Sequence, residues 1–380
     1  MTPFIYLDHN ATTPMLPEVW EAMRPYGTDT YGNPASSHGA GRRARQALED
    51  ARERIATLLG AFADEVIFTS GATEANNLAI FGLAGSTPGH LIANPMEHPC
   101  VIEPLRQLAE RGFTVDWLSV NAEGKVEAEP ETDWLRPDTR LVCVMGVNHE
   151  TGAIQPIERL RAQLPETVAF HCDATQAVGK LPVRFHDLGV TTMSLSAHKF
   201  HGPKGIGALL LNRCTRLRPL LWGGHQQQGR RPGTEPVPLV VGMAAALECW
   251  QRDADRRLEH VQELRQRFWE QVRTEAAPVV RNGSEKDNVP HTLNVSFPGC
   301  PAETLLMKLD LAGVACSTGS ACSSGSLRPS PVLRAMRVPD DVLRSALRFS
   351  WSHVVTTAEV DEAARRVVTA VRQLRQQRPE

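Results

Sequence analysis

The chain has 380 residues, of which 42% are apolar, so it can bury a large hydrophobic core and its length suits two domains. Its 41 basic and 43 acidic residues give a formal net charge of -2, which excludes a strong general attraction to nucleic acid or to a membrane. Neither a bilayer-spanning segment nor a signal-peptide pattern is visible, so we expect a cytoplasmic protein without a membrane partner.

The eight cysteines are scattered without a Cys-x-x-Cys pair, which argues against both a zinc ribbon and a disulfide scaffold. We therefore expect no metal site. Cys143 and Cys172 fall inside apolar runs and are expected to be buried free thiols, and Cys316 is expected to be packed.

Between about residues 40 and 215 helix-like and strand-like segments alternate, starting with a helical run at 42–59. Seven short apolar strands are predicted, at 66–68, 91–93, 115–118, 141–145, 168–172, 191–195 and 207–211. Their near-continuous apolar character predicts a mostly parallel sheet that is covered by helices on both faces.

The pattern changes after Pro238. One long helix is predicted from Val240 to about Arg273, followed by strands at 292–297 and 347–350, a helix at 302–311 and a C-terminal helix. This indicates a smaller α+β domain. We place the large α/β domain at 15–255 and the small domain, with the N-terminal segment, at 1–14 plus 256–380.

Chemically capable residues follow the predicted strands, where ligands bind in open parallel sheets. The turn that contains Ala72 and Thr73 opens a helix and could bind a phosphate, while His98, Asp173, Gln176 and the His198-Lys199 pair follow other strands. A desolvated lysine is a nucleophile toward an aldehyde cofactor such as pyridoxal phosphate, and an aspartate can pair with the pyridinium nitrogen of that cofactor.

Each of these features also fits an ordinary structural role. Lys199 could snorkel from a strand end, the glycine turn is common before helices, and Asp173 could cap a helix. It is their occurrence together at several strand ends that favours one pyridoxal-phosphate site.

Cys322 differs from the other thiols because it lies in a run of Gly, Ser and Ala that suits neither a packed helix nor a buried strand. Such a loop can present a reactive thiol to a substrate that is held elsewhere. An incidental loop cysteine is the alternative interpretation.

Several strings give the chain a nearly end-to-end resemblance to the cysteine desulfurases of the NifS/IscS type, within the class V aminotransferase-like, fold-type-I pyridoxal-phosphate enzymes. They are Leu7-Asp8-His9-Asn10-Ala11-Thr12-Thr13-Pro14, Ser70-Gly71-Ala72-Thr73-Glu74, Asp173-Ala174-Thr175-Gln176, Ser196-Ala197-His198-Lys199 and Ser317-Thr318-Gly319-Ser320-Ala321-Cys322. The last string is similar to the catalytic-cysteine loop of that family.

The resemblance implies conversion of L-cysteine to L-alanine, with the sulfur passing to Cys322 as a persulfide and then to an acceptor or iron–sulfur scaffold protein. Lys199 would hold the cofactor as a Schiff base and move the α-proton. Asp173 would pair with the ring nitrogen and Gln176 with the ring oxygen, while His98 would be catalytic, stacking on the ring and assisting proton transfer. The other implied cofactor contacts are Ala72, Thr73, Ser196 and His198, with Thr234 supplied by the other subunit of a homodimer. Asn148, Arg348 and Asn10 would bind the substrate.

The chain departs from the family pattern at His9, His225, Arg328 and His353. These departures leave the cofactor groups intact and put substrate access and the sulfur acceptor in doubt. Two alternatives remain open. One is a selenocysteine lyase, or another lyase or aminotransferase of the same family, in which Cys322 would be dispensable; the other is a cofactor-bound scaffold for a sulfur acceptor.

Overall fold

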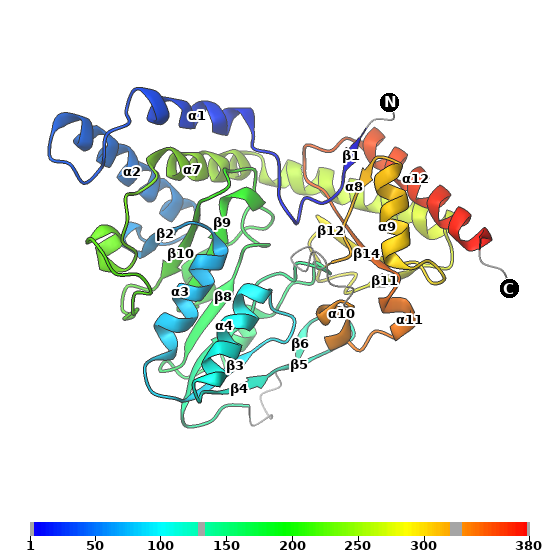
Figure 1. Ribbon diagram of the computed structural model, residues 1–380, viewed down its shortest axis with the longest axis horizontal. Coiled ribbons are helices and arrows are strands. Elements are labelled where there is room, and N and C mark those ends of the chain that lie inside the picture. The colour runs from blue at the N-terminus through cyan, green and yellow to red at the C-terminus, as the bar shows by residue number, and fades with distance from the viewer. Residues whose placement is uncertain (1–3, 128–133, 320–328, 378–380) are drawn as a thin grey trace.

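The computed structural model describes residues 4–127, 134–319 and 329–377. Its main feature is a seven-stranded sheet, in agreement with the predicted α/β class (Figure 1). The strands, all near the predicted positions, are β2 (Val66–Thr69), β3 (His90–Ala93), β4 (Thr114–Trp117), β7 (Thr139–Cys143), β8 (Ala169–Asp173), β9 (Thr192–Ser196) and β10 (Gly207–Leu211).

The order of the strands across the sheet is β2-β10-β9-β8-β7-β3-β4. Strand β10 runs antiparallel to both of its neighbours, and every other pairing is parallel. The carboxyl ends of β3, β7, β8 and β9 therefore meet along one edge, which is where an open parallel sheet forms its ligand site.

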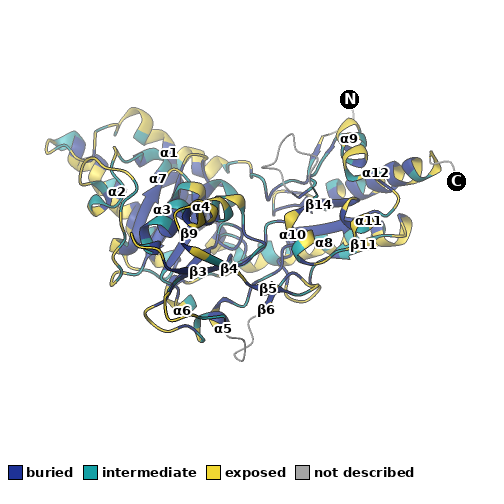
Figure 2. Ribbon diagram, turned by 60° about the horizontal axis from the view of Figure 1, so that its bottom comes forward, coloured by how far each residue is buried: buried dark blue, intermediate teal, exposed yellow. Residues whose placement is uncertain are grey.

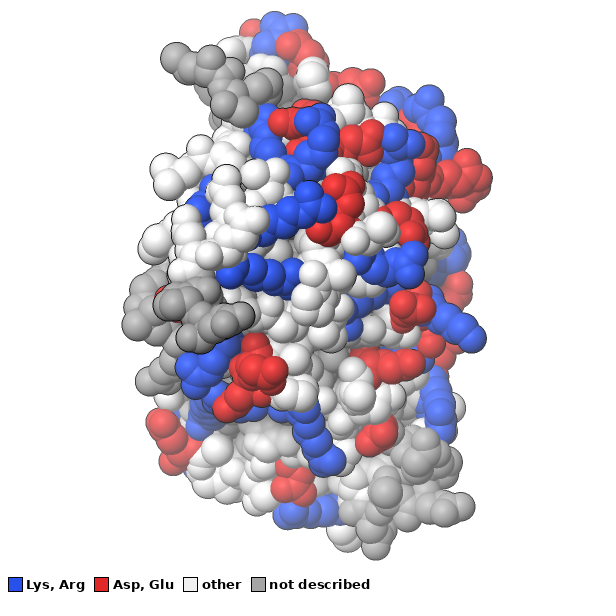
Figure 3. Space-filling view, turned by 90° about the vertical axis from the view of Figure 1, so that its right-hand side faces the viewer, with Lys and Arg blue, Asp and Glu red and all other residues white. Residues whose placement is uncertain are grey.

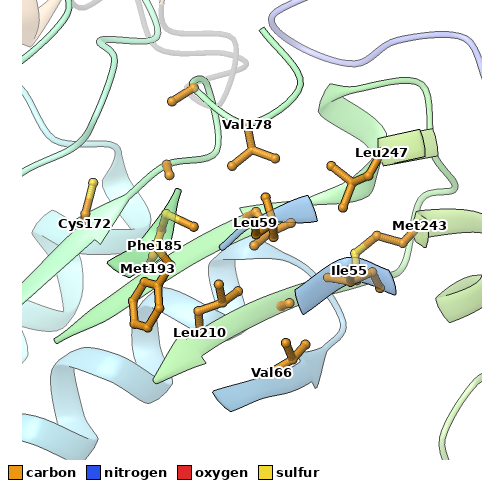
Figure 4. Packing of buried hydrophobic residues seen from close by; sticks show 14 of the residues in the cluster. Ile55, Leu59, Val66, Cys172, Val178, Phe185, Met193, Leu210, Met243 and Leu247 are labelled. Carbon is orange, nitrogen blue, oxygen red and sulfur yellow. The ribbon is translucent and has the colours of Figure 1, made fainter. Parts of the chain in front are cut away.

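Helices cover both faces of this sheet because alternate residues of each strand point to opposite sides. On one face α3 (Ala72–Ala84) and α4 (Pro99–Glu110) bury residues such as Leu91 and Leu141. On the other face lie α1 (Pro17–Thr28), α2 (Gly39–Leu58) and α7 (Val237–Arg252). Figure 4 shows side chains of α2 and α7 packed over Val66, Met193 and Leu210. Strands β2, β3, β9 and β10 are buried along their length, whereas the edge strand β4 is partly exposed (Figure 2).

A second hydrophobic core lies beside the first. It is built from α8 (Ala254–Glu275), α9 (Ala302–Leu311), α12 (Thr357–Gln376) and the antiparallel sheet β11 (Val280–Asn282), β12 (Thr292–Ser296) and β14 (Ala346–Ser350). The N-terminal strand β1 (Ile5–Tyr6) joins this core by pairing with β13 (Val314–Ala315). The domain boundaries inferred from the sequence remain a prediction.

The prediction of one continuous helix from Val240 to about Arg273 is wrong. Asp253 separates α7 from α8, and its φ of -126° and ψ of 21° are not helical. The apolar spacing continues across the break because both helices bury one face, but they bury it in different cores.

The remaining short elements connect these layers. They are β5 (Ser119–Val120), β6 (Val126–Glu127), α5 (Ile157–Arg161), α6 (Phe185–Leu188), α10 (Pro331–Ala335), α11 (Asp340–Leu343) and the 3-10 turns η1 (Ala63–Glu65), η2 (Ala197–Lys199) and η3 (Gln226–Gly229).

Basic residues near the C-terminus are largely paired within the fold. Arg366 bonds to Glu362, and Arg375 donates to the carbonyl oxygens of Ala276 and Pro298. Figure 3 shows basic and acidic side chains interspersed on this end of the molecule, which does not favour a nucleic-acid partner. In the described part of the chain, none of the helices combines the length and the apolarity that crossing a bilayer requires.

Candidate functional site

Two hollows meet at the carboxyl edge of the large sheet. The α3 hollow, of about 530 Å³, is lined by the turn before α3 and by the ends of β8 and β9. The α4 hollow, of about 700 Å³, is lined by the first turns of α4, by Arg348 of β14 and by residues of α10. Lys199, His98, His149 and Gln176 line both hollows, so the two spaces share one wall.

Lys199 ends the η2 turn directly after β9, and its side chain is half-buried. Its ammonium Nζ donates to the carbonyl oxygens of Asn10, at 2.6 Å, and Ala11, at 3.0 Å. Gly179, with a φ of +74°, allows the chain to approach this turn closely, because a Cβ atom there would overlap Phe200. The lysine is therefore presented to both hollows by packing from three separate segments.

Asp173 is the last residue of β8 and lines the α3 hollow. Its Oδ1 accepts from the backbone N–H of Thr175 at 2.9 Å within a turn, and Oδ2 accepts from Asn76 Nδ2 at 2.8 Å; the next helix in the described chain begins only at Phe185, so the helix-cap interpretation is wrong. Both carboxylate oxygens thus accept hydrogen bonds, and the group is buried.

Asn76 connects Asp173 to the inside of the sheet and was missed in the sequence analysis. Its Oδ1 accepts from Ser194 Oγ at 2.5 Å and lies 2.9 Å from His171 Nε2. The signal for this residue was present, because Asn76 lies four residues from Ala72 and Ile80 on the buried stripe of α3.

The turn before α3 faces residues from the end of β9. Ala72, Thr73, Ser196, His198 and Lys204 all line the α3 hollow. The first turn of a helix has unpaired backbone N–H groups, which together with the helix dipole favour an anion. We infer that this end of the hollow suits a phosphate group.

His198 has a neutral imidazole under ordinary conditions. Burial, and next the charge of Lys199, lowers the pKa of His198 to about 4. Its ring Nδ1 lies 3.1 Å from Thr12 Oγ1, and its carbonyl oxygen accepts from the backbone N–H and the hydroxyl of Thr13. These contacts fix the imidazole against the N-terminal segment.

His98 caps α4, with its ring Nδ1 accepting from the backbone N–H of Cys100 at 3.2 Å. The ring lies edge-on to His149, with 5.4 Å between the ring centroids. Burial lowers the pKa of His98, against the opposing effect of the Asp173 charge, so a neutral imidazole is favoured.

Gln176 and Asn10 are joined in one buried network. Gln176 Nε2 donates to the Asn10 carbonyl oxygen at 3.0 Å, and Lys180 Nζ donates to both side chains. Burial lowers the pKa of Lys180 well below its usual value. Asn10 Nδ2 also donates to His149 and Thr292, so this residue links the N-terminal segment to both cores.

Arg348 reaches the α4 hollow from β14, a strand of the second core. Its guanidinium donates to Asp8 Oδ1 at 2.7 Å and to the carbonyl oxygens of His149, at 3.0 Å, and Gly319, at 3.3 Å. Arg348 Nε is buried and makes no hydrogen bond to the described residues.

Asn148 lies next to the hollows but lines neither of them. Its Oδ1 accepts from the backbone N–H groups of Glu150 and Thr151, both at 2.9 Å, and from the Thr151 hydroxyl. The side chain is fully buried in this turn. Its predicted role in substrate binding stays a prediction.

Thr234 lies on an exposed segment between η3 and α7 and lines neither hollow. Cys322 and Arg328 lie outside the described residues. Cys143 and Cys172 are buried as predicted, and Cys316, whose pKa is raised by burial, packs against the second core.

Two buried carboxyl groups in the α4 hollow were not predicted as site residues. Glu97 Oε1 accepts from the backbone N–H of Met145 at 2.5 Å, and burial and the nearby Asp173 charge raise the pKa of Glu97 well above its usual value. Glu150 lines the same hollow from the Asn148 turn. Sequence spacing gave no reason to expect either side chain to be buried.

The chain was compared with known proteins. Residues 5–363 match the family model described as aminotransferase class-V. The cysteine desulfurase IscS of Dictyoglomus turgidum is 42% identical over 94% of this chain and 92% of its own length. The human cysteine desulfurase is 42% identical over 99% of this chain and 83% of its own length. The chain belongs to the cysteine desulfurases of the class-V aminotransferase family.

Solved structures of this family share the fold. A NifS-like protein has a TM-score of 0.91 and 34% identity, with 96% of this chain and 98% of that one covered. SspA in complex with cysteine has a TM-score of 0.82 and 36% identity, over 91% of this chain and 98% of that one. The class-V fold therefore extends over both cores and both hollows of this chain.

Proposed function

We propose that this chain is a pyridoxal-phosphate-dependent cysteine desulfurase, which converts L-cysteine to L-alanine and transfers the sulfur to Cys322. The observation that carries the proposal is the meeting of Lys199, Asp173 and a phosphate-binding type of turn in the α3 hollow, next to Arg348 in the α4 hollow. A lysine amine, a buried carboxylate and an anion site are the groups that this cofactor requires.

The residues present fit pyridoxal phosphate. Lys199 would form the covalent link, the α3 turn with Ser196 and His198 would bind the phosphate, and Asp173 would pair with the ring nitrogen. Gln176 would donate to the ring oxygen, and His98 would cover the ring face. When bound, the cofactor supplies an electron sink for the α-carbon of the substrate.

The chain's own groups would then bind cysteine and move its protons. The Arg348 guanidinium, which lines the α4 hollow, suits the substrate carboxylate, because a charge-assisted hydrogen bond to a guanidinium is strong in a desolvated site. The Lys199 amine would take the α-proton of the substrate and return one to the product. The neutral imidazole of His98 can accept or donate a proton beside it.

The sulfur step balances without an external oxidant or reductant. The Cys322 thiolate attacks the substrate sulfur, the carbon–sulfur bond of the substrate breaks, and the β-carbon receives a proton. The substrate carbon is reduced to the methyl group of alanine while the Cys322 sulfur is oxidised to a persulfide. An acceptor or iron–sulfur scaffold protein would then take the outer sulfur.

Two substitutions separate the two roles. Lys199→Ala should abolish the borohydride-reducible link to the cofactor, because among the described lysines Lys199 is the one that lines both hollows. Cys322→Ala should keep the bound cofactor and stop sulfide release in the presence of dithiothreitol. Cys214→Ala, which changes an exposed thiol away from the hollows, is the matched control. A Cys322→Ala protein that desulfurates cysteine at the normal rate would refute the persulfide mechanism.

A cytoplasmic homodimer is part of the proposal. The exposed position of Thr234, away from its own hollows, supports a role in the site of a second copy. The Trp222 and Tyr31 side chains are 86% and 76% exposed, which favours a protein contact over these residues. Mixing inactive Thr234→Ala and Lys199→Ala proteins should restore part of the activity in mixed dimers; complete lack of rescue in a confirmed mixed dimer would contradict the shared site.

A further inference from the structure

Glu150 is a buried carboxyl group in the α4 hollow for which the proposed reaction has no use. The residue is 1% exposed and belongs to the turn that Asn148 holds. Its carbonyl oxygen accepts from Asn294 Nδ2 at 3.4 Å, so the backbone is tied to β12 as well. The side chain therefore starts from a fixed position.

The Glu150 carboxyl contacts two chain positions that are far from it in sequence. Oε2 accepts from Ser330 Oγ at 2.5 Å, and Ser330 Oγ in turn accepts from the backbone N–H of Leu333 as the cap of α10. The same carboxyl packs on Gly319, where an added Cβ atom would lie 2.5 Å from Oε2. Gly319 has a φ of +97°, which also favours glycine.

Burying the Glu150 carboxyl group lowers the stability of the folded chain. Burial raises the pKa of Glu150 to about 7, although the Ser330 hydrogen bond and the Arg348 charge act in the opposite direction. Oε1 has no hydrogen-bond partner among the described residues, and the nearest imidazole nitrogen, His149 Nε2, is 3.8 Å away. An apolar side chain at position 150 would avoid the free-energy cost of burying a carboxyl group, so a role of Glu150 beyond packing is favoured.

We propose that Glu150 is a positioning residue for the sulfur-transfer step, in which its carboxyl group fixes Gly319 and Ser330, the two flanks of the segment that contains Cys322. Residues 320–328 themselves lie outside the described residues, and the proposal rests on the flanks. It also rests on the proposed function, because it assumes that Cys322 receives the sulfur. Glu150 acts through the positions of the flanks.

The test measures two steps separately in the holoenzyme. The first is the change in cofactor absorbance on mixing with L-cysteine, and the second is persulfide on Cys322, measured by rapid quench and mass spectrometry. Glu150→Ala and Ser330→Ala should each slow persulfide formation about tenfold, the loss expected for one strong hydrogen bond, and change the absorbance step less than about twofold.

Conservative variants and the double variant sharpen this test. Glu150→Gln and Ser330→Thr keep a hydrogen-bonding pair and should restore most of the rate. The double variant Glu150→Ala/Ser330→Ala should be no slower than Glu150→Ala, because both changes remove the same contact. Ser345→Ala removes another buried hydroxyl, which donates to the Val342 carbonyl oxygen away from both hollows, and should leave both steps unchanged.

Three results would overturn the proposal. They are equal losses in both steps, normal persulfide formation in Ser330→Ala, or additive losses in the double variant. If Glu150→Ala fails to fold, Ser330→Ala and Ser330→Thr decide the question by themselves. A wild-type protein that forms no persulfide from cysteine refutes the proposed function instead, so the two failures are distinguishable.

Discussion

Replacing Asn76 by Ala tests whether the buried network behind Asp173 stabilises the site. The change removes the partner of Asp173 Oδ2, of Ser194 Oγ and of His171 Nε2, all of which are buried. A hydrogen bond to a charged group contributes about 1.5–3 kcal/mol and a neutral one about 1 kcal/mol. The higher helix propensity of Ala offsets about 0.5 kcal/mol. We therefore expect a loss of about 3–4.5 kcal/mol in the free energy of unfolding.

The measurement is urea unfolding of the cofactor-free protein, followed by tryptophan fluorescence and analysed from midpoints and slopes. Asn77→Ala is the matched control, since Asn77 is the next residue of α3 and its side chain, among the described residues, makes one exposed hydrogen bond, to the Thr73 carbonyl oxygen. This control should lose less than about 1 kcal/mol. If the two variants differ by less than about 1 kcal/mol, the network does not carry the stability assigned to it.

Three further predictions concern packing, pH and substrate binding. Gly179→Ala should lower the free energy of unfolding by about 2 kcal/mol or more, because the new Cβ atom meets Phe200 and φ is positive; an unchanged urea midpoint would contradict this. Burial, followed by the charge of His201, lowers the pKa of His353 to about 3. The His353 imidazole therefore stays neutral in the folded protein, whereas in the unfolded chain it binds a proton below about pH 6.5. The free energy of unfolding consequently falls as the pH falls from about 6.5 towards 3. Between pH 7.5 and 5.5, the free energy of unfolding of His353→Gln should therefore fall by about 1 kcal/mol less than that of the wild type, as measured by urea unfolding. His225→Gln, which changes an exposed histidine, is the control. Equal decreases in the two variants would refute the assignment. Arg348→Lys should raise KM for cysteine about tenfold or more while the cofactor absorbance stays normal, and an unchanged KM would remove Arg348 from substrate binding.

The sequence predicted the large sheet well because its strands are short, apolar and separated by helices. All seven strands lie close to the expected positions, and Lys199, Asp173 and the α3 turn follow the strands that the pattern indicated. Since parallel strands end at one edge, their order alone brings these residues near one another. The family resemblance then supplied the roles for which spacing gives no evidence.

Residues from the second core could not be placed in this way. Arg348 enters the α4 hollow from β14, and its contacts with Asp8, His149 and Gly319 join segments from three parts of the chain. The break at Asp253 was missed because apolar periodicity continues through it. Periodicity reports that a face is buried, but it does not report which core buries that face.

The phosphate-binding type of turn, Lys199 and Asp173 were accessible from the sequence because local chain geometry after a strand determines where such residues point. Glu97 and Glu150 became recognisable as parts of the site only in the folded chain, and so did the partners of Asn76, although its place on the buried stripe of α3 could be read from the sequence. Asn148 illustrates the same difference, since its side chain is engaged in its own turn. Hydrogen bonding and charge in a buried site depend on neighbours that are distant in sequence, and tertiary packing alone brings those neighbours into contact.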